Sequence, residues 1–154
     1  MKEETKHNYL LLGIGNYGRQ DDGLGWEFLD LLKPKKIANT TCEYRFQLQI
    51  EDAELLRSYD NIIFIDASKE ELKNGFKWSV CTSSEKYSFS THALHPETII
   101  YLSEYLYNHK PKAHILAIQG YDWELHNGLT EKAKDNLNKA FTYLTEEIFC
   151  LTKV

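Results

Sequence analysis

Three short runs of consecutive apolar residues mark the chain, each ending at or beside a glycine or a carboxylate. They occupy residues 9–15, 61–67 and 114–120. Strands that are apolar on both faces are typical of parallel sheets covered by helices on both sides. The pattern therefore predicts three buried, central strands.

Between these runs, apolar residues recur at helical spacing. Leu24, Phe28, Leu31 and Leu32 would share one face of a helix, and a second series extends from Ala133 to Ile148. Pro96 is suited to the first turn of a further helix. The predicted helices are 23–32, 52–59, 96–106 and 133–148, and weaker strands are predicted at 41–46 and 76–82.

The resulting order is β-α-β-α-β-β-α-β-α, with a hairpin-like insertion around Asn74 and Gly75. This order predicts an α/β protein, and residues 1–154 suit a single domain. With a strand order of 2-1-3-4-5, the first and third strands are neighbours. Ligands of such sheets bind beyond the carboxyl ends of the strands, where the strand order reverses.

Charge narrows the range of partners. The chain has 18 Lys+Arg and 23 Asp+Glu, a net charge of −5, which argues against a general binder of nucleic-acid phosphates. No apolar stretch approaches the ~18 residues of a membrane helix, so we expect a cytoplasmic protein that binds neither nucleic acid nor membrane. The spacing of the cysteines, Cys42, Cys81 and Cys150, suggests reduced, structural thiols.

Residues Gly13 to Gly18 match the G-x-G-x-x-G pattern of dinucleotide-binding loops. The chemistry contradicts that interpretation. Asp21 and Asp22 follow the loop and would repel a pyrophosphate. The acid expected to bind the ribose is also missing, since residues 46–49 occupy its place.

Two acids at strand ends are better suited to a cation. Asp22 and Asp66 would converge if the first and third strands adjoin, and His92 lies in a loop at the same edge. Two carboxylates and one imidazole suit a divalent transition metal with open coordination positions. Structural alternatives exist: Asp21 is favoured as the N-cap of the first helix, Asp66 would cap the turn at 68–71, and an isolated histidine is more often structural.

The chain also carries a series of motifs in a particular order. These are Gly13–Asn16, Asp21–Gly25, Ile65–Ala67, Ser90–Leu94, Ile118–Gln119, Trp123–Glu124 and Gly128–Thr130. Together they resemble the hydrogenase maturation protease family, endopeptidases that trim the C-terminal extension of the large subunit of nickel-iron hydrogenases. The resemblance implies a phosphorylase/hydrolase-like three-layer α/β/α sandwich around a twisted, mainly parallel five-stranded sheet.

The resemblance also implies roles for individual residues. Asp22, Asp66 and His92 would bind the metal, and Asp22 and Asp66 would be catalytic. Weaker expectations for substrate binding fall on Asn16, Asp21, Gln119 and Glu124. The metal would be nickel supplied by the substrate, the partner would be the large-subunit precursor, and a monomer is expected. Two mechanisms stay open: a metal that polarises the scissile carbonyl while Asp22 activates water, or nickel that only docks the substrate while a carboxylate does the acid–base work.

Some features depart from the family. Gly120 stands where the family often has proline, and residues 46–53 lack its Gly-Gly-Thr type of loop. A non-catalytic nickel-binding maturation factor is one alternative. A peptidyl-tRNA hydrolase relative is another, disfavoured because Asp21 and Asp22 occupy the place of a His-Asn pair and because the chain lacks a basic face.

Overall fold

The computed structural model describes residues 8–84 and 94–151. Its centre is a five-stranded sheet in the order β2-β1-β3-β5-β4. The strands are β1 (Tyr9–Ile14), β2 (Thr40–Arg45), β3 (Asn61–Ser68), β4 (Phe76–Val80) and β5 (Lys112–Gln119). All neighbouring pairs are parallel except β4 and β5. The predicted mainly parallel α/β fold is therefore confirmed.

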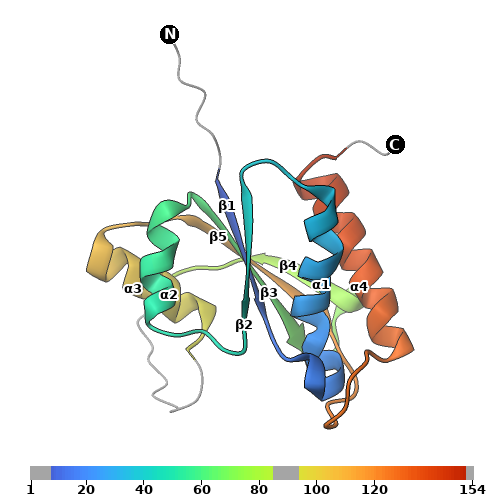
Figure 1. The fold of residues 1–154 in the computed structure, drawn as a ribbon. Coiled ribbons are helices and arrows are strands. Elements are labelled where there is room, and N and C mark those ends of the chain that lie inside the picture. The colour runs from blue at the N-terminus through green and yellow to red at the C-terminus, as the bar shows by residue number, and fades with distance from the viewer. Residues whose placement is uncertain (1–7, 85–93, 152–154) are drawn as a thin grey trace.

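Helices cover both faces of the sheet, which gives the expected three layers (Figure 1). One face carries α1 (Leu24–Leu32) and α4 (Glu131–Tyr143), and the other carries α2 (Glu51–Leu55) and α3 (Pro96–Tyr107). A π turn at Leu144–Ile148 extends α4, and 3-10 turns lie at Tyr17–Gly23, Lys33–Lys35, Leu56–Ser58 and Lys73–Gly75. In the part of the chain that the structure describes, no helix is both long and apolar enough to cross a membrane.

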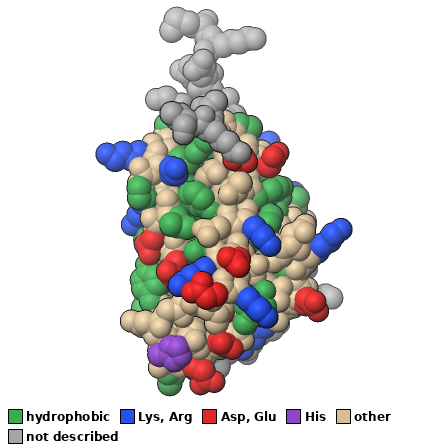
Figure 2. Space-filling view, turned by 90° about the vertical axis from the view of Figure 1, so that its right-hand side faces the viewer, with side chains coloured by type: hydrophobic (Ala, Val, Ile, Leu, Met, Phe, Trp, Pro, Cys, Tyr) green, Lys and Arg blue, Asp and Glu red, His purple; other side chains and the backbone are tan. Residues whose placement is uncertain are grey.

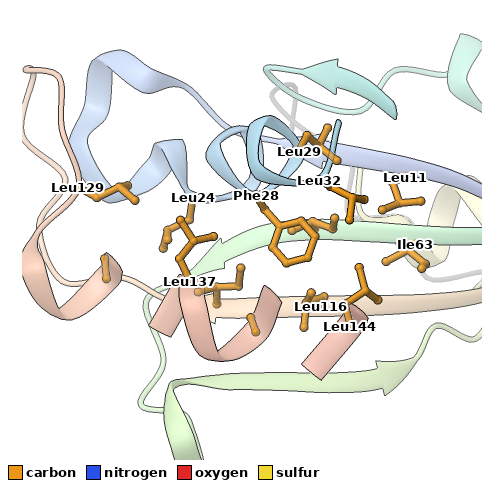
Figure 3. Close-up of a cluster of buried hydrophobic side chains, with 14 residues drawn as sticks. Leu11, Leu24, Phe28, Leu29, Leu32, Ile63, Leu116, Leu129, Leu137 and Leu144 are labelled. Atoms are coloured by element: carbon orange, nitrogen blue, oxygen red, sulfur yellow. The ribbon is translucent and has the colours of Figure 1, made fainter. Parts of the chain in front are cut away.

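The sheet has a hydrophobic core on each face because successive side chains of a strand point to opposite sides. Leu11 of β1 packs with Phe28 and the other residues between the sheet, α1 and α4 (Figure 3). Leu10 and Leu12 pack with Phe64 on the side of α2 and α3. This double burial explains the continuous apolar run of β1. Leu31, expected on the apolar face of α1, is instead 40% exposed.

Two details of the predicted topology are wrong. The order 2-1-3-4-5 is wrong because β5, not β4, lies beside β3. The hairpin-like insertion is wrong because β4 pairs with β5, the strand that follows α3. Asn74 and Gly75 do form a turn with positive φ angles of 65° and 85°, but it carries the chain to the outer edge of the sheet. β1 and β3 adjoin in both orders, so the site is unaffected.

The surface over α1 and α4 carries acidic and basic side chains side by side (Figure 2). No field of one sign dominates this face. Such a mixture suits a solvated surface and gives no electrostatic reason for a polyanion to bind there.

Candidate active site

The carboxyl end of β1 is held tightly against the turn that carries Asp22. Gly15 follows β1 with φ of +154°, and a Cβ atom added there would lie 2.0 Å from the carbonyl oxygen of Asp22. The same oxygen accepts a hydrogen bond of 3.0 Å from the amide of Asn16. No side chain fits at position 15, and Asp22 is thereby fixed beside the end of the strand.

Asp66 reaches the same edge from the neighbouring strand. It pairs in register with Ile14, the last residue of β1. Asp22 and Asp66 then line one cleft of about 410 Å³. The other lining residues are Arg19, Ala67, Lys69 and Trp123. The convergence of the two carboxylates that the strand ends predict is present in the structure.

Burial raises the pKa of both carboxyl groups, and the charge of Asp22 also acts on Asp66. Burial and the negative charge of Asp22 raise the pKa of Asp66 to about 7, against the opposing effect of a hydrogen bond from the Ala67 backbone. Burial also raises the pKa of Asp22, while Arg19 and Lys69 act to lower it. At neutral pH the pair therefore carries an exchangeable proton. Such a pair is suited to acid–base chemistry or, once deprotonated, to a divalent cation.

The third member of the predicted metal set, His92, lies outside the described residues. Leu94 forms an antiparallel bridge with Leu48, three residues beyond the end of β2. Within residues 8–84 and 94–151, no group of three or more His, Cys, Asp or Glu side chains is placed to hold a metal. The set of Asp22, Asp66 and His92 stays a prediction.

Asp21 has a role that the sequence interpretation missed. The predicted helix cap is wrong, because Gly23 is the N-cap of α1 and no side chain caps it. Asp21 is fully buried. Its carboxylate accepts hydrogen bonds from the amides of Tyr121 (2.7 Å), Asp122 (3.1 Å) and Thr130 (2.8 Å), and from the Thr130 hydroxyl (2.9 Å). These contacts tie the 17–23 turn to the loop after β5.

Gln20 reinforces the same connection. Its backbone amide donates a hydrogen bond to the carbonyl of His126 (2.9 Å), and its side-chain oxygen accepts one from the backbone amide of Glu124 (3.0 Å). Its backbone has φ of 49° and ψ of −114°, a region that residues with a side chain rarely adopt. Strain of this kind persists only where surrounding contacts impose it.

The remaining predicted substrate-binding residues do not line the cleft. The side chain of Asn16 accepts a hydrogen bond from the amide of Gly18 (2.8 Å), and the side-chain oxygen of Gln119 accepts one from the amide of Leu72 (2.8 Å). Glu124 is exposed. Asn16 and Gln119 thus have structural contacts, and substrate binding by these residues stays a prediction.

Sequence reasoning gave no role in the cleft to Arg19, Lys69 or Trp123. The one feature of the sequence that could have indicated the position of Trp123 is Gly120. Its amide donates to the carbonyl of Ser68 (2.9 Å), which proline could not do. A Cβ atom there would lie 2.7 Å from the Cβ of Asp21 and 2.8 Å from the Trp123 ring. Gly120 therefore allows Trp123 to pack into the wall of the cleft.

Several solved structures with the same fold are hydrogenase maturation proteases. A [NiFe] hydrogenase maturation protease HycI from Thermococcus kodakarensis KOD1 matches with a TM-score of 0.73 and 19% identity, over 96% of this chain and 95% of that one. The hydrogenase maturating endopeptidase HybD from E. coli matches with a TM-score of 0.72 and 19% identity, over 91% and 93%. The chain has the fold of the hydrogenase maturation endopeptidases.

An uncharacterized protein from Wolinella succinogenes also shares this fold, with a TM-score of 0.64 and 22% identity over 96% of this chain and 100% of that one. No protein-family model and no curated protein matches the sequence. The likeness to the maturation endopeptidases is therefore one of structure, and it confirms the three-layer fold that the sequence motifs imply.

Proposed function

We propose that this chain is a hydrogenase maturation protease, an endopeptidase that removes the C-terminal extension from the large-subunit precursor of a nickel-iron hydrogenase. The observation that carries the proposal is the pairing of Asp22 and Asp66 in one cleft at the carboxyl edge of β1 and β3. Two findings support it. The fold is shared with maturation endopeptidases, and the pKa of Asp66 is raised to about 7.

Hydrolysis of a peptide bond requires a base for the attacking water and an acid for the leaving amine. Burial raises the pKa of Asp22, but Arg19 and Lys69 act to lower it, whereas burial and the charge of Asp22 raise the pKa of Asp66 to about 7. In our proposal Asp22 is therefore the member of the pair that ionises first. In our proposal the Asp22 carboxylate takes a proton from water as the C–O bond forms. Asp66, protonated in a large fraction of molecules at neutral pH, gives its proton to the nitrogen as the C–N bond breaks.

Nickel enters this proposal as part of the substrate and as its recognition signal. Asp22 and Asp66 would hold it, with His92 as the proposed third ligand. Carboxylate and imidazole groups are suitable ligands for a divalent transition metal. Binding by both carboxyl groups requires both to be ionised, so in this proposal nickel must leave the pair before Asp66 takes up the proton that it later gives to the leaving nitrogen.

Cleavage is tested by mixing the purified chain with a nickel-loaded large-subunit precursor and measuring the mass of the precursor. We expect a shorter product with wild type and none with Asp22→Asn or Asp66→Asn. Asp135→Asn, at an exposed position of α4, is the matched control and should cleave as wild type does. Full activity of either cleft variant would contradict the assignment of that carboxylate.

Titration calorimetry with Ni²⁺ alone separates the protease from the non-catalytic alternative. We expect binding by wild type, loss of binding in Asp22→Asn and Asp66→Asn, and at least about tenfold weaker binding in His92→Ala, since loss of even an outer-shell partner of a ligand costs about tenfold or more. Unchanged affinity in His92→Ala would remove that residue from the site. Nickel binding without cleavage of any precursor would identify a nickel-binding maturation factor.

A further inference from the structure

The cleft holds positive charge that the hydrolytic proposal does not use. Arg19 and Lys69 line it together with Asp22 and Asp66. In the described part of the chain, no carboxylate oxygen lies within 4.0 Å of a side-chain nitrogen of Arg19 or Lys69, so neither cation forms an ion pair there. Both cations nevertheless act on Asp22 at longer range. The opposite charges therefore share one cleft without neutralising each other by direct contact.

Lys69 is positioned by its neighbours. Its ammonium lies 5.3 Å from the centre of the Trp123 ring, a cation–π distance. Two hydrogen bonds fix the loop around it: the Ser68 hydroxyl accepts from the amide of Glu70 (3.1 Å), and Gln119 accepts from the amide of Leu72 (2.8 Å). Lys69 thus extends from a hydrogen-bonded loop along the ring of Trp123.

Arg19 also comes from a constrained segment. It directly precedes Gln20, whose positive φ is imposed by hydrogen bonds to the loop after β5. Backbone strain of this kind is concentrated at functional sites. The two cations therefore reach the cleft from two different loops, one after β1 and the other after β3.

We propose that Arg19, Lys69 and Trp123 form an anion subsite that binds a carboxylate of the peptide substrate. The peptide identity of the ligand rests on the proposed function. Guanidinium and ammonium groups bind carboxylates, and an indole face packs against a peptide or an aliphatic side chain. The nearby Asp22 and Asp66 repel a phosphate dianion more strongly than a single carboxylate. The carboxylate belongs to an acidic side chain or to the C-terminus of the substrate.

The test follows the indole N–H signal of Trp123 by NMR during titration with small peptides. The chain has three tryptophans, and Trp123→Phe assigns the signal. The probes are acetyl-Gly-Asp-Gly-amide, acetyl-Gly-Asn-Gly-amide, acetyl-triglycine with a free carboxylate, and inorganic phosphate. We expect a saturable shift with one or both carboxylate peptides, with a Kd of about 1–10 mM, as for a few exposed contacts, and none with the Asn peptide.

Lys69→Gln and Arg19→Gln should each weaken this binding by about fivefold or more, as for loss of a charged hydrogen bond. Lys132→Gln is the matched control. Its ammonium lies over another ring, 5.5 Å from the centre of Tyr121, outside the cleft lining, and its loss should leave the affinity unchanged.

Equal shifts with the Asp and Asn peptides would overturn the subsite. So would unchanged affinity in both folded variants, or phosphate binding more tightly than either peptide. A shift with the Asp peptide alone assigns the subsite to a side chain, and a shift with acetyl-triglycine alone assigns it to a C-terminus. The titration requires neither nickel nor hydrolysis. It can therefore detect binding at the subsite even if the precursor is not cleaved.

Discussion

Two adjacent aspartates lie in opposite surroundings. Asp21 is fully buried, and its carboxylate accepts four hydrogen bonds, from Tyr121, Asp122 and Thr130. Asp22 faces an open cleft, and in the described part of the chain no donor makes a hydrogen bond or ion pair with its carboxylate. One peptide bond separates a structural acid from the acid that we propose to be reactive.

The difference shows how the environment assigns a role to a carboxyl group. Buried charges are tolerated when hydrogen bonds replace the water they lose. Asp21 has that replacement and fixes two loops. Burial raises the pKa of both Asp22 and Asp66, and the negative charge of Asp22 raises the pKa of Asp66 further. A cation or a proton relieves the repulsion between two such charges, which is the basis of the proposed chemistry.

The largest effect is expected from Asp21→Ala. The substitution removes a fully buried carboxylate and leaves the amides of Tyr121 and Thr130 without their acceptor, so the free energy of unfolding should fall by about 3–5 kcal/mol. Urea denaturation measures the change. Asp22→Ala is the natural control, and it should change stability by less than about 1 kcal/mol. Equal losses in the two variants would abolish the contrast between them.

The second effect is a pH dependence caused by Asp66. Its pKa is about 7 in the folded protein and about 3.9 when unfolded, so its contribution to stability is fully present below pH ~4 and is lost as the pH rises to about 7. In the presence of a chelator, Asp66→Asn should match wild type near pH 4 and should be more stable by about 2–4 kcal/mol above pH 7.

Thermal or urea unfolding between pH 4 and pH 8 measures this gap. Asp60→Asn, at an exposed position just before β3, is the control. Its difference in stability from wild type should not grow with pH. A constant difference between wild type and Asp66→Asn across this range would contradict the raised pKa.

The smallest effect is expected from Gly120→Ala, at a position that contacts both Asp21 and the cleft residue Trp123. The added methyl would contact Asp21 and the Trp123 ring at 2.7 and 2.8 Å, and the ring is the neighbour more able to move. We expect a loss of about 1–2 kcal/mol in unfolding free energy and a changed Trp123 indole signal. An unchanged indole signal would show that the ring does not pack against this glycine.

The sequence predicts the convergence of Asp22 and Asp66 because Asp22 follows one apolar strand and Asp66 lies near the end of another. The carboxyl ends of these strands share one edge of the sheet. It did not place β4, because a short edge strand is positioned by long-range packing and not by its own pattern. The role of Asp21 depends on amides about a hundred residues away, which local helix-capping preferences do not reveal. The positions of Lys69 and Trp123 likewise depend on contacts between two loops.

The four hydrogen bonds to Asp21 also bear on hydrogen exchange. The loop after β5 has no regular secondary structure between Gln119 and Glu131, and irregular loops usually exchange their amide protons quickly. Here the amide protons of Tyr121 and Thr130 are hydrogen-bonded to the buried carboxylate of Asp21. We expect them to exchange with deuterium mainly when the turn before α1 separates from the loop. Both amides should therefore exchange together, at the rate of that separation.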